Sequence, residues 1–112
     1  MLNRIQLRGI CGRVSTQKVG DSTLVDLSVM TDYVHKSRSG DPICETTWHH
    51  VRKFYGENDR IPPFEKGCVI EAEGRLRVQK YNSGVFTEVA AKRIECLDKS
   101  WLLVGNRLPA EE

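Results

Sequence analysis

Alternate residues between Trp48 and Phe54 form the most informative pattern in the sequence. A β-strand places alternate side chains on one face. Such a strand would therefore carry Trp48, His50, Arg52 and Phe54 on one face and His49, Val51 and Lys53 on the other. Aromatic rings stack on bases and cationic side chains hold the backbone, and no acid interrupts residues 46–56. The pattern favours a surface for single-stranded nucleic acid. The alternative is that Trp48 packs in the core with Phe54 as its partner.

A second segment repeats this mixture of cations and rings. A strand over residues 68–81 would place Arg75, Arg77, Gln79 and Tyr81 on one face and the apolar Ile70, Ala72, Leu76 and Val78 on the other, towards the core. If the two strands are neighbours, three aromatics form a platform edged by arginines. Each base stacked on such a platform contributes about 1–3 kcal/mol, whatever its identity. Lys80 completes the expected set of phosphate-binding cations.

Composition and charge are consistent with one domain that binds an anion. The chain has 112 residues and a net charge of +2, which alone predicts no partner. The basic residues are grouped, however. The first twenty residues contain four cations and no acid, and residues 74–87 again lack acids. Because aromatics lie among these cations, the distribution favours nucleic acid over a plain solvated face.

The hydrophobic pattern predicts an all-β fold, because period-two alternation recurs along the chain. Five strands are expected: 3–14, 23–33, 45–55, 68–81 and 84–97. Gly9 and Gly12 predict bends or a bulge, and Asn82-Ser83-Gly84 predicts a tight hairpin. Residues 34–44 have the composition of a flexible basic loop, and Pro62-Pro63 excludes a continuous helix in residues 57–67. We predict a five-stranded OB-fold barrel with an irregular crossover between strands 3 and 4. A small SH3-like barrel or sandwich also fits.

The sequence offers little for catalysis or metal binding. Adjacent His49 and His50 point to opposite faces of a strand, so they cannot ligate one metal. No Cys-His spacing fits a metal site, and no P-loop or nucleophile motif occurs. Cys11, Cys44, Cys68 and Cys96 form no Cys-x-x-Cys pair, which predicts buried free thiols in a reducing cytoplasm. We expect no enzyme activity, no cofactor, no metal and no membrane span.

Several segments resemble bacterial single-stranded DNA-binding proteins. The resemblance covers about residues 1–98. Its segments are Leu2-Asn3-Arg4-Ile5-Gln6-Leu7-Arg8-Gly9, Thr47-Trp48-His49-His50-Val51, Gly67–Leu76 and Thr87-Glu88-Val89. The resemblance implies an oligomer of OB-folds that wraps single-stranded DNA during replication, recombination or repair, here as a homotetramer. It implies stacking roles for Trp48, Phe54 and Tyr81, with Tyr33 or His35 at a fourth aromatic position. It also implies that His49 supports the subunit interface.

Three features depart from that family. The crossover lacks a helix pattern, the hairpin at residues 82–84 is short, and the chain stops at Leu108-Pro109-Ala110-Glu111-Glu112 without a long acidic tail. In that family the acidic tail recruits replication and repair proteins, so the resemblance leaves partners of this kind open. The last two features also resemble the primosomal replication protein B family, whose members are dimeric accessories that act mainly through protein interactions. We expect an OB-fold domain over residues 1–98 and a short C-terminal extension over residues 99–112.

Overall fold

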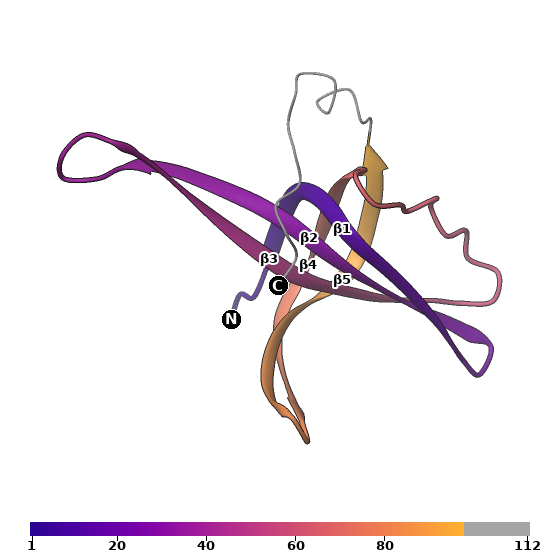
Figure 1. The fold of residues 1–112 in the computed structure, drawn as a ribbon. Coiled ribbons are helices and arrows are strands. Elements are labelled where there is room, and N and C mark those ends of the chain that lie inside the picture. Colours follow the sequence, from indigo (N-terminus) through magenta and orange to yellow (C-terminus); the bar gives the residue numbers. More distant parts are fainter. Residues whose placement is uncertain (98–112) are drawn as a thin grey trace.

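Five long strands make up the structure, a computed structural model that describes residues 1–97 (Figure 1). They are β1 (Ile5–Val19), β2 (Ser22–Lys36), β3 (Pro42–Tyr55), β4 (Val69–Tyr81) and β5 (Gly84–Leu97). Residues 1–97 contain no helix, and so none that could cross a membrane. The expected extension over residues 99–112, with Trp101-Leu102-Leu103-Val104, lies outside the described residues.

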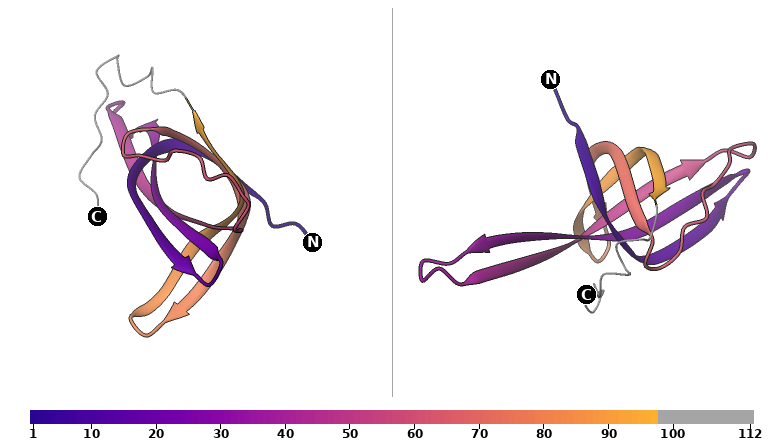
Figure 2. Two further views of the ribbon diagram at one scale, coloured as in Figure 1. Left: turned by 90° about the vertical axis from the view of Figure 1, so that its right-hand side faces the viewer. Right: turned by 90° about the horizontal axis from the view of Figure 1, so that it is seen from above.

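The strands close into a barrel in the order β1-β2-β3-β5-β4. β1 pairs with β2 through its second half and with β4 through residues 5–10, which completes the ring seen along the barrel in Figure 2. β3 and β5 meet in a short parallel pairing, Val51 with Val89 and Arg52 with Ala90. This five-stranded barrel, with its long connection between β3 and β4, confirms the predicted OB-fold.

The alternating residues fill the barrel as predicted. Val25, Leu27 and Val29 of β2 point inward and are fully buried, with polar Asp26 and Ser28 between them on the outer face. The remaining core comes from the other strands and includes Cys11, Val51, Ile70, Ala72, Val89 and Ile94. The predicted bulge is confirmed at Gly12, where the β1–β2 register shifts between Cys11 and Arg13.

Two hairpins extend beyond the barrel, and one corrects a prediction. Residues 34–44 were expected to form a flexible loop, but β2 and β3 stay paired out to Lys36 and Pro42, leaving only residues 37–41 as a turn. We call the part of this hairpin that projects beyond the barrel the β2–β3 arm. Side-chain hydrogen bonds between the two strands continue along it: Thr46 donates to Asp32 at 2.7 Å, and His35 lies 3.2 Å from Glu45. Turn-forming residues indicated that a loop lies between β2 and β3, but they did not indicate where the pairing of the two strands ends.

The β4–β5 hairpin corrects a second prediction. Leu76 and Val78 continue the apolar alternation of β4 and were expected in the core, yet they are 46% and 61% exposed. The reason is that β4 and β5 leave the barrel together after the register shift at Gly74. The hairpin closes through the predicted tight turn, with Tyr81 paired to Gly84.

The crossover over residues 56–68 is irregular, as predicted. Its end is fixed to β1 by two backbone hydrogen bonds, Gly67 N–H to the carbonyl of Cys11 and Cys11 N–H to the carbonyl of Cys68. Cys11 and Cys68 are buried, but Cys44 is exposed on the arm, contrary to expectation. Burial, with the nearby Cys68 thiol, raises the pKa of Cys96 to about 11, so its thiol is not ionised at neutral pH.

Candidate nucleic-acid interface

The outer face of the barrel brings together most of the predicted stacking and phosphate-binding residues. Strand register places Trp48, His50, Arg52 and Phe54 of β3 on the same face as Met30, Ser28, Asp26 and Leu24 of β2, because these residues are directly paired. The inner side of β3 is marked by the buried Val51 and Tyr55. The predicted alternation of this strand is therefore confirmed.

Trp48 reaches across the sheet rather than into the core. Its six-membered ring extends from β3 over β2 to the bulge of β1, where a Cβ on Gly12 would lie 2.3 Å from Cζ3 of Trp48. The ring therefore rests on bare backbone that only glycine provides. Trp48 is half-buried, so one part of the indole is supported by the protein and another remains accessible. This geometry suits stacking against a base.

Arg52 and Tyr81 meet, although β3 and β4 are not neighbours. β5 lies between them in the sheet, which corrects the condition on which the aromatic platform was expected. The Nη1 of Arg52 nevertheless donates to the hydroxyl of Tyr81 at 2.9 Å. The Tyr81 ring also lies 5.6 Å from the ring of Phe86. β4 and β5 thus bring a second aromatic pair to the same surface as Trp48.

A buried carboxylate, Glu88 of β5, binds the two arginines of this surface. Glu88 is only 2% exposed, and its oxygens lie 3.4 Å from Nη1 of Arg52 and 3.3 Å from Nη2 of Arg77. Arg52 also lies 3.4 Å from Asp26, which contacts His50 in turn. Glu88 is not among the site residues predicted from the sequence. The signal available was a lone acid in the otherwise uncharged segment 81–91.

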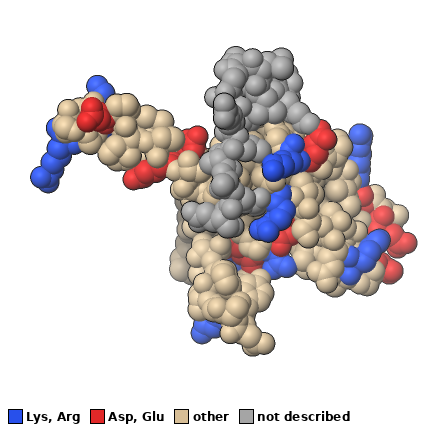
Figure 3. All heavy atoms as spheres, viewed as in Figure 1, with Lys and Arg blue, Asp and Glu red and all other residues tan. Residues whose placement is uncertain are grey.

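This arrangement changes the electrostatics expected from the sequence. The cluster of Arg52, Arg77, Asp26 and Glu88 contains two cations and two carboxylates, so it carries no net charge. The face of the molecule seen in Figure 3 likewise intersperses basic and acidic side chains. Arg52 and Arg77 are therefore oriented donors rather than free positive charges.

A groove adjoins Trp48 where the two projecting hairpins separate. It has a volume of about 400 Å³ and lies between the β3 segment 47–50 and the β5 segment 86–89, with Leu76 of β4 at its side. Trp48 and Phe86 both line it. A flexible strand entering this groove would meet aromatic rings from both hairpins.

Three predicted residues, Tyr33, Lys80 and Phe54, lie away from the cluster around Arg52 and Glu88. Tyr33 pairs with Glu45 and so lies on the face of the arm opposite Trp48, 5.5 Å from His35. Lys80 alternates with Gln79 and Tyr81 and lies on the opposite face of the β4–β5 hairpin. Phe54 shares the face of Trp48 and is 55% exposed, but it lies near the end of β3, beyond Arg52. Arg75 is on the outer face, in register with Ala90.

His49 points away from Trp48, as expected from strand alternation. Its Nε2 lies 2.7 Å from the Thr31 hydroxyl, and burial lowers its pKa from the ordinary histidine value. Burial thus favours the neutral ring, which is held by β2. It stays a predicted interface residue, separate from the stacking surface.

Solved structures of single-stranded DNA-binding proteins are similar to this fold. The wild-type protein from Thermus aquaticus has a TM-score of 0.68 at 23% identity over 87% of this chain and 50% of that chain, and its deletion mutant has a TM-score of 0.72 at 23% identity over 87% and 51%. The chain thus spans about half of the Thermus protein. The Plasmodium falciparum SSB, solved in complex with ssDNA, has a TM-score of 0.73 at 19% identity over 88% and 96%.

These likenesses establish the class of fold. The chain is a five-stranded OB-fold protein with the architecture of the two single-stranded DNA-binding proteins just described. No protein-family model matches the sequence, and no curated protein matches it.

Proposed function

We propose that this protein binds single-stranded DNA without strong sequence preference, protecting it during replication, recombination or repair. The observation that carries the proposal is the shared outer face of Trp48, Arg52 and Tyr81 on an OB-fold. OB-folds bind oligonucleotides on the face of strands 2 and 3 and at the loop between strands 4 and 5. Both regions carry exposed aromatics here, and stacking tolerates any base.

In this proposal each side chain has a stated role. Trp48 and Tyr81 stack on bases, and Phe54 extends the stacking surface along β3. Arg52, Arg77 and Arg75 contact the backbone, with the first two oriented by Glu88. Tyr33 and Lys80 act from the opposite faces of their hairpins, so they contact a strand only as it passes around the arm or the hairpin tip.

The proposed assembly is a homotetramer in the cytoplasm, with His49 nearer the subunit interface than the DNA. Its support is the position of His49 opposite Trp48 and the resemblance in sequence. A dimer that acts mainly through protein interactions, like the primosomal accessory, is the second candidate, favoured by the tight turn between Tyr81 and Gly84. Native mass spectrometry separates a tetramer from a dimer.

Fluorescence anisotropy with labelled oligothymidine tests the function. We expect binding to single strands, much weaker binding to a duplex of the same length, and an affinity that falls as salt rises. Equal affinity for the duplex, or no binding to oligothymidine, would overturn the proposal. Weak binding by a stable dimer would favour the primosome-type alternative.

A further inference from the structure

We propose that a hollow on the flank of the barrel forms a second contact for the DNA backbone, next to the Trp48 surface. This flank hollow has a volume of about 660 Å³ and is lined by Asn3, Arg4, Glu73, Gly74, Arg75, Ala90 and Lys92. The inference rests on the proposed function and extends it. It assigns DNA contacts to Lys92, which was not predicted from the sequence, and to Arg4, which the sequence placed only in a basic N-terminal run.

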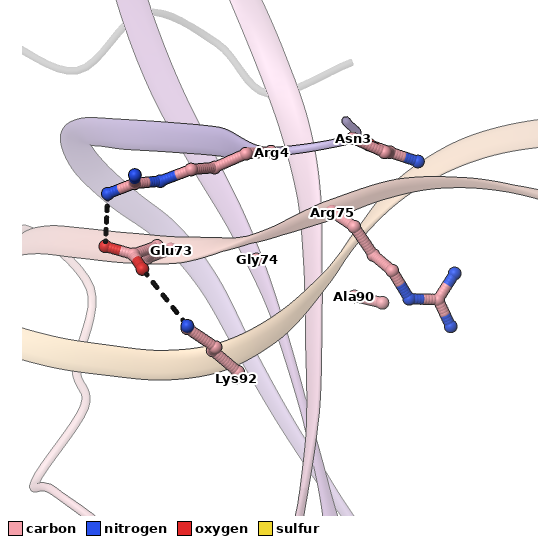
Figure 4. A pocket seen from close by; sticks show the side chains of 7 residues that line it. All are labelled: Asn3, Arg4, Glu73, Gly74, Arg75, Ala90 and Lys92. Carbon is pink, nitrogen blue, oxygen red and sulfur yellow. Dashed lines mark ion pairs between the residues drawn. The ribbon is translucent and has the colours of Figure 1, made fainter. Parts of the chain in front are cut away.

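The floor of the hollow is small side chains and backbone. Gly74 of β4 lies close to the backbone of Ala90 on β5, and a Cβ on Gly74 would lie 2.2 Å from the carbonyl oxygen of Ala90. No larger side chain fits there, so the floor stays low. Arg4 approaches from the segment before β1, while Lys92 approaches from β5 (Figure 4). An extended backbone could therefore lie close to the sheet between them.

The hollow has a net positive charge, unlike the neutral cluster around Glu88 on the Trp48 surface. Its lining holds three cations, Arg4, Arg75 and Lys92, and one carboxylate, Glu73. Arg4 and Lys92 each lie 3.5 Å from Glu73, and their side chains are 62% and 77% exposed. Ion pairs this exposed contribute little to stability. Both cations can thus turn to a phosphate at small cost.

Glu73 keeps the cations in place without DNA. Partial burial works to raise the pKa of Glu73, but Arg4, Lys92 and Arg93 hold it below its ordinary value. The carboxylate is therefore ionised at neutral pH and positions the ends of Arg4 and Lys92. Arg75 makes no ion pair with any of residues 1–97, and Figure 4 shows its guanidinium directed away from Glu73.

Strand register connects the hollow to the Trp48 surface. Arg52 of β3 is opposite Ala90 of β5, which is opposite Arg75 of β4. These three residues form one row on the outer face, and adjacent strands are about 5 Å apart, so the row spans about 10 Å of sheet. A strand stacked near Arg52 needs only a few more nucleotides to reach the hollow.

The test compares short and long oligothymidines on the intact protein. One OB-fold covers about 4–16 nucleotides, so a strand of about 5 thymines should occupy the Trp48 surface and one of about 15 should also reach the hollow. We expect the double variant Arg4→Gln/Lys92→Gln to bind the long strand about 5- to 25-fold more weakly near 0.1 M salt. This corresponds to one or two lost phosphate contacts, each worth about 0.7 in the slope of log K against log salt. Binding of the short strand should be unchanged.

The control is Lys66→Gln, which removes one exposed positive charge in the crossover. The single variant Lys92→Gln is compared directly with Lys66→Gln, because each removes one positive charge and neither alters Arg4, which could affect assembly. Lys92→Gln should weaken binding of the long strand only. Native mass spectrometry checks the assembly of each variant. If the parent protein binds both strands and the variants weaken neither, or weaken both equally, the flank hollow is not a DNA contact while the proposed function stands. If the parent protein binds neither strand, the proposed function itself fails.

Discussion

Replacing Glu88 by glutamine should tighten DNA binding while destabilising the fold. Glu88 neutralises one of the two positive charges that Arg52 and Arg77 bring to the proposed surface, and Asp26 neutralises the other. Glu88→Gln keeps the size and an acceptor oxygen but changes the net charge of the cluster from zero to +1. One more effective phosphate contact steepens the slope of log K against log salt by about 0.7, which near 0.1 M salt corresponds to about fivefold tighter binding.

The cost to the fold follows from the same contacts. Hydrogen bonds to charged groups contribute about 1.5–3 kcal/mol, and Glu88 accepts from both arginines in a nearly inaccessible position. We therefore expect the free energy of unfolding, measured by urea titration, to fall by about 1.5–3 kcal/mol. Anisotropy titrations at several salt concentrations give the affinity and its slope.

Glu57→Gln is the matched control, because it makes the same charge change in the exposed segment after β3. It should alter neither affinity nor stability appreciably. If Glu88→Gln instead weakens binding in a fully folded protein, then orientation of the arginines matters more than their charge, and the electrostatic reasoning is refuted.

Three further variants test the Trp48 surface and His49. Trp48→Ala should lower the affinity for oligothymidine by about 1–3 kcal/mol and abolish most of the DNA-induced fluorescence quench. It should cost less than about 3 kcal/mol in stability, because Trp48 is not fully buried; a variant that unfolds, or that binds like the parent, contradicts this. Gly12→Ala should weaken binding although the indole remains, since a Cβ 2.3 Å from Cζ3 must displace the ring; an unchanged affinity and emission spectrum would argue against it. In the His49→Gln variant, thermal stability should fall less steeply than in the parent protein as the pH is lowered below about 6.5. Burial lowers the pKa of His49, so on acidification the unfolded chain binds the proton first and native stability falls; equal pH slopes for parent and variant would exclude this linkage.

The alternation of apolar and polar residues predicted the barrel, because each strand has one face that must be buried. It also predicted which residues of β3 share a face, since parity survives errors in strand ends. It failed at Leu76 and Val78, where the same alternation continues after β4 has left the barrel. Alternation shows that one face of a strand is apolar, but it does not show whether another part of the protein covers that face.

The sequence could not reveal how charges pair across strands. Arg52, Arg77 and Glu88 come from three different strands, and they meet only because β5 lies between β3 and β4. A count of basic residues therefore overstated the free positive charge of the Trp48 surface. Tyr33 shows a second limit of the sequence. It was expected on the stacking surface, but its pairing with Glu45 places it on the opposite face of the arm from Trp48.

The cluster around Glu88 is neutral, whereas the flank hollow has a net positive charge. Base stacking and phosphate contacts should therefore differ in how strongly they depend on salt. Phosphate contacts release counterions and weaken as salt rises, whereas stacking does not depend on released ions. The relative loss caused by Trp48→Ala should therefore stay nearly constant from low to high salt. The loss caused by Lys92→Gln should shrink towards zero over the same range. If both losses decline in parallel, the charge of the two regions is not divided as the ion pairs of Glu88 and Glu73 indicate.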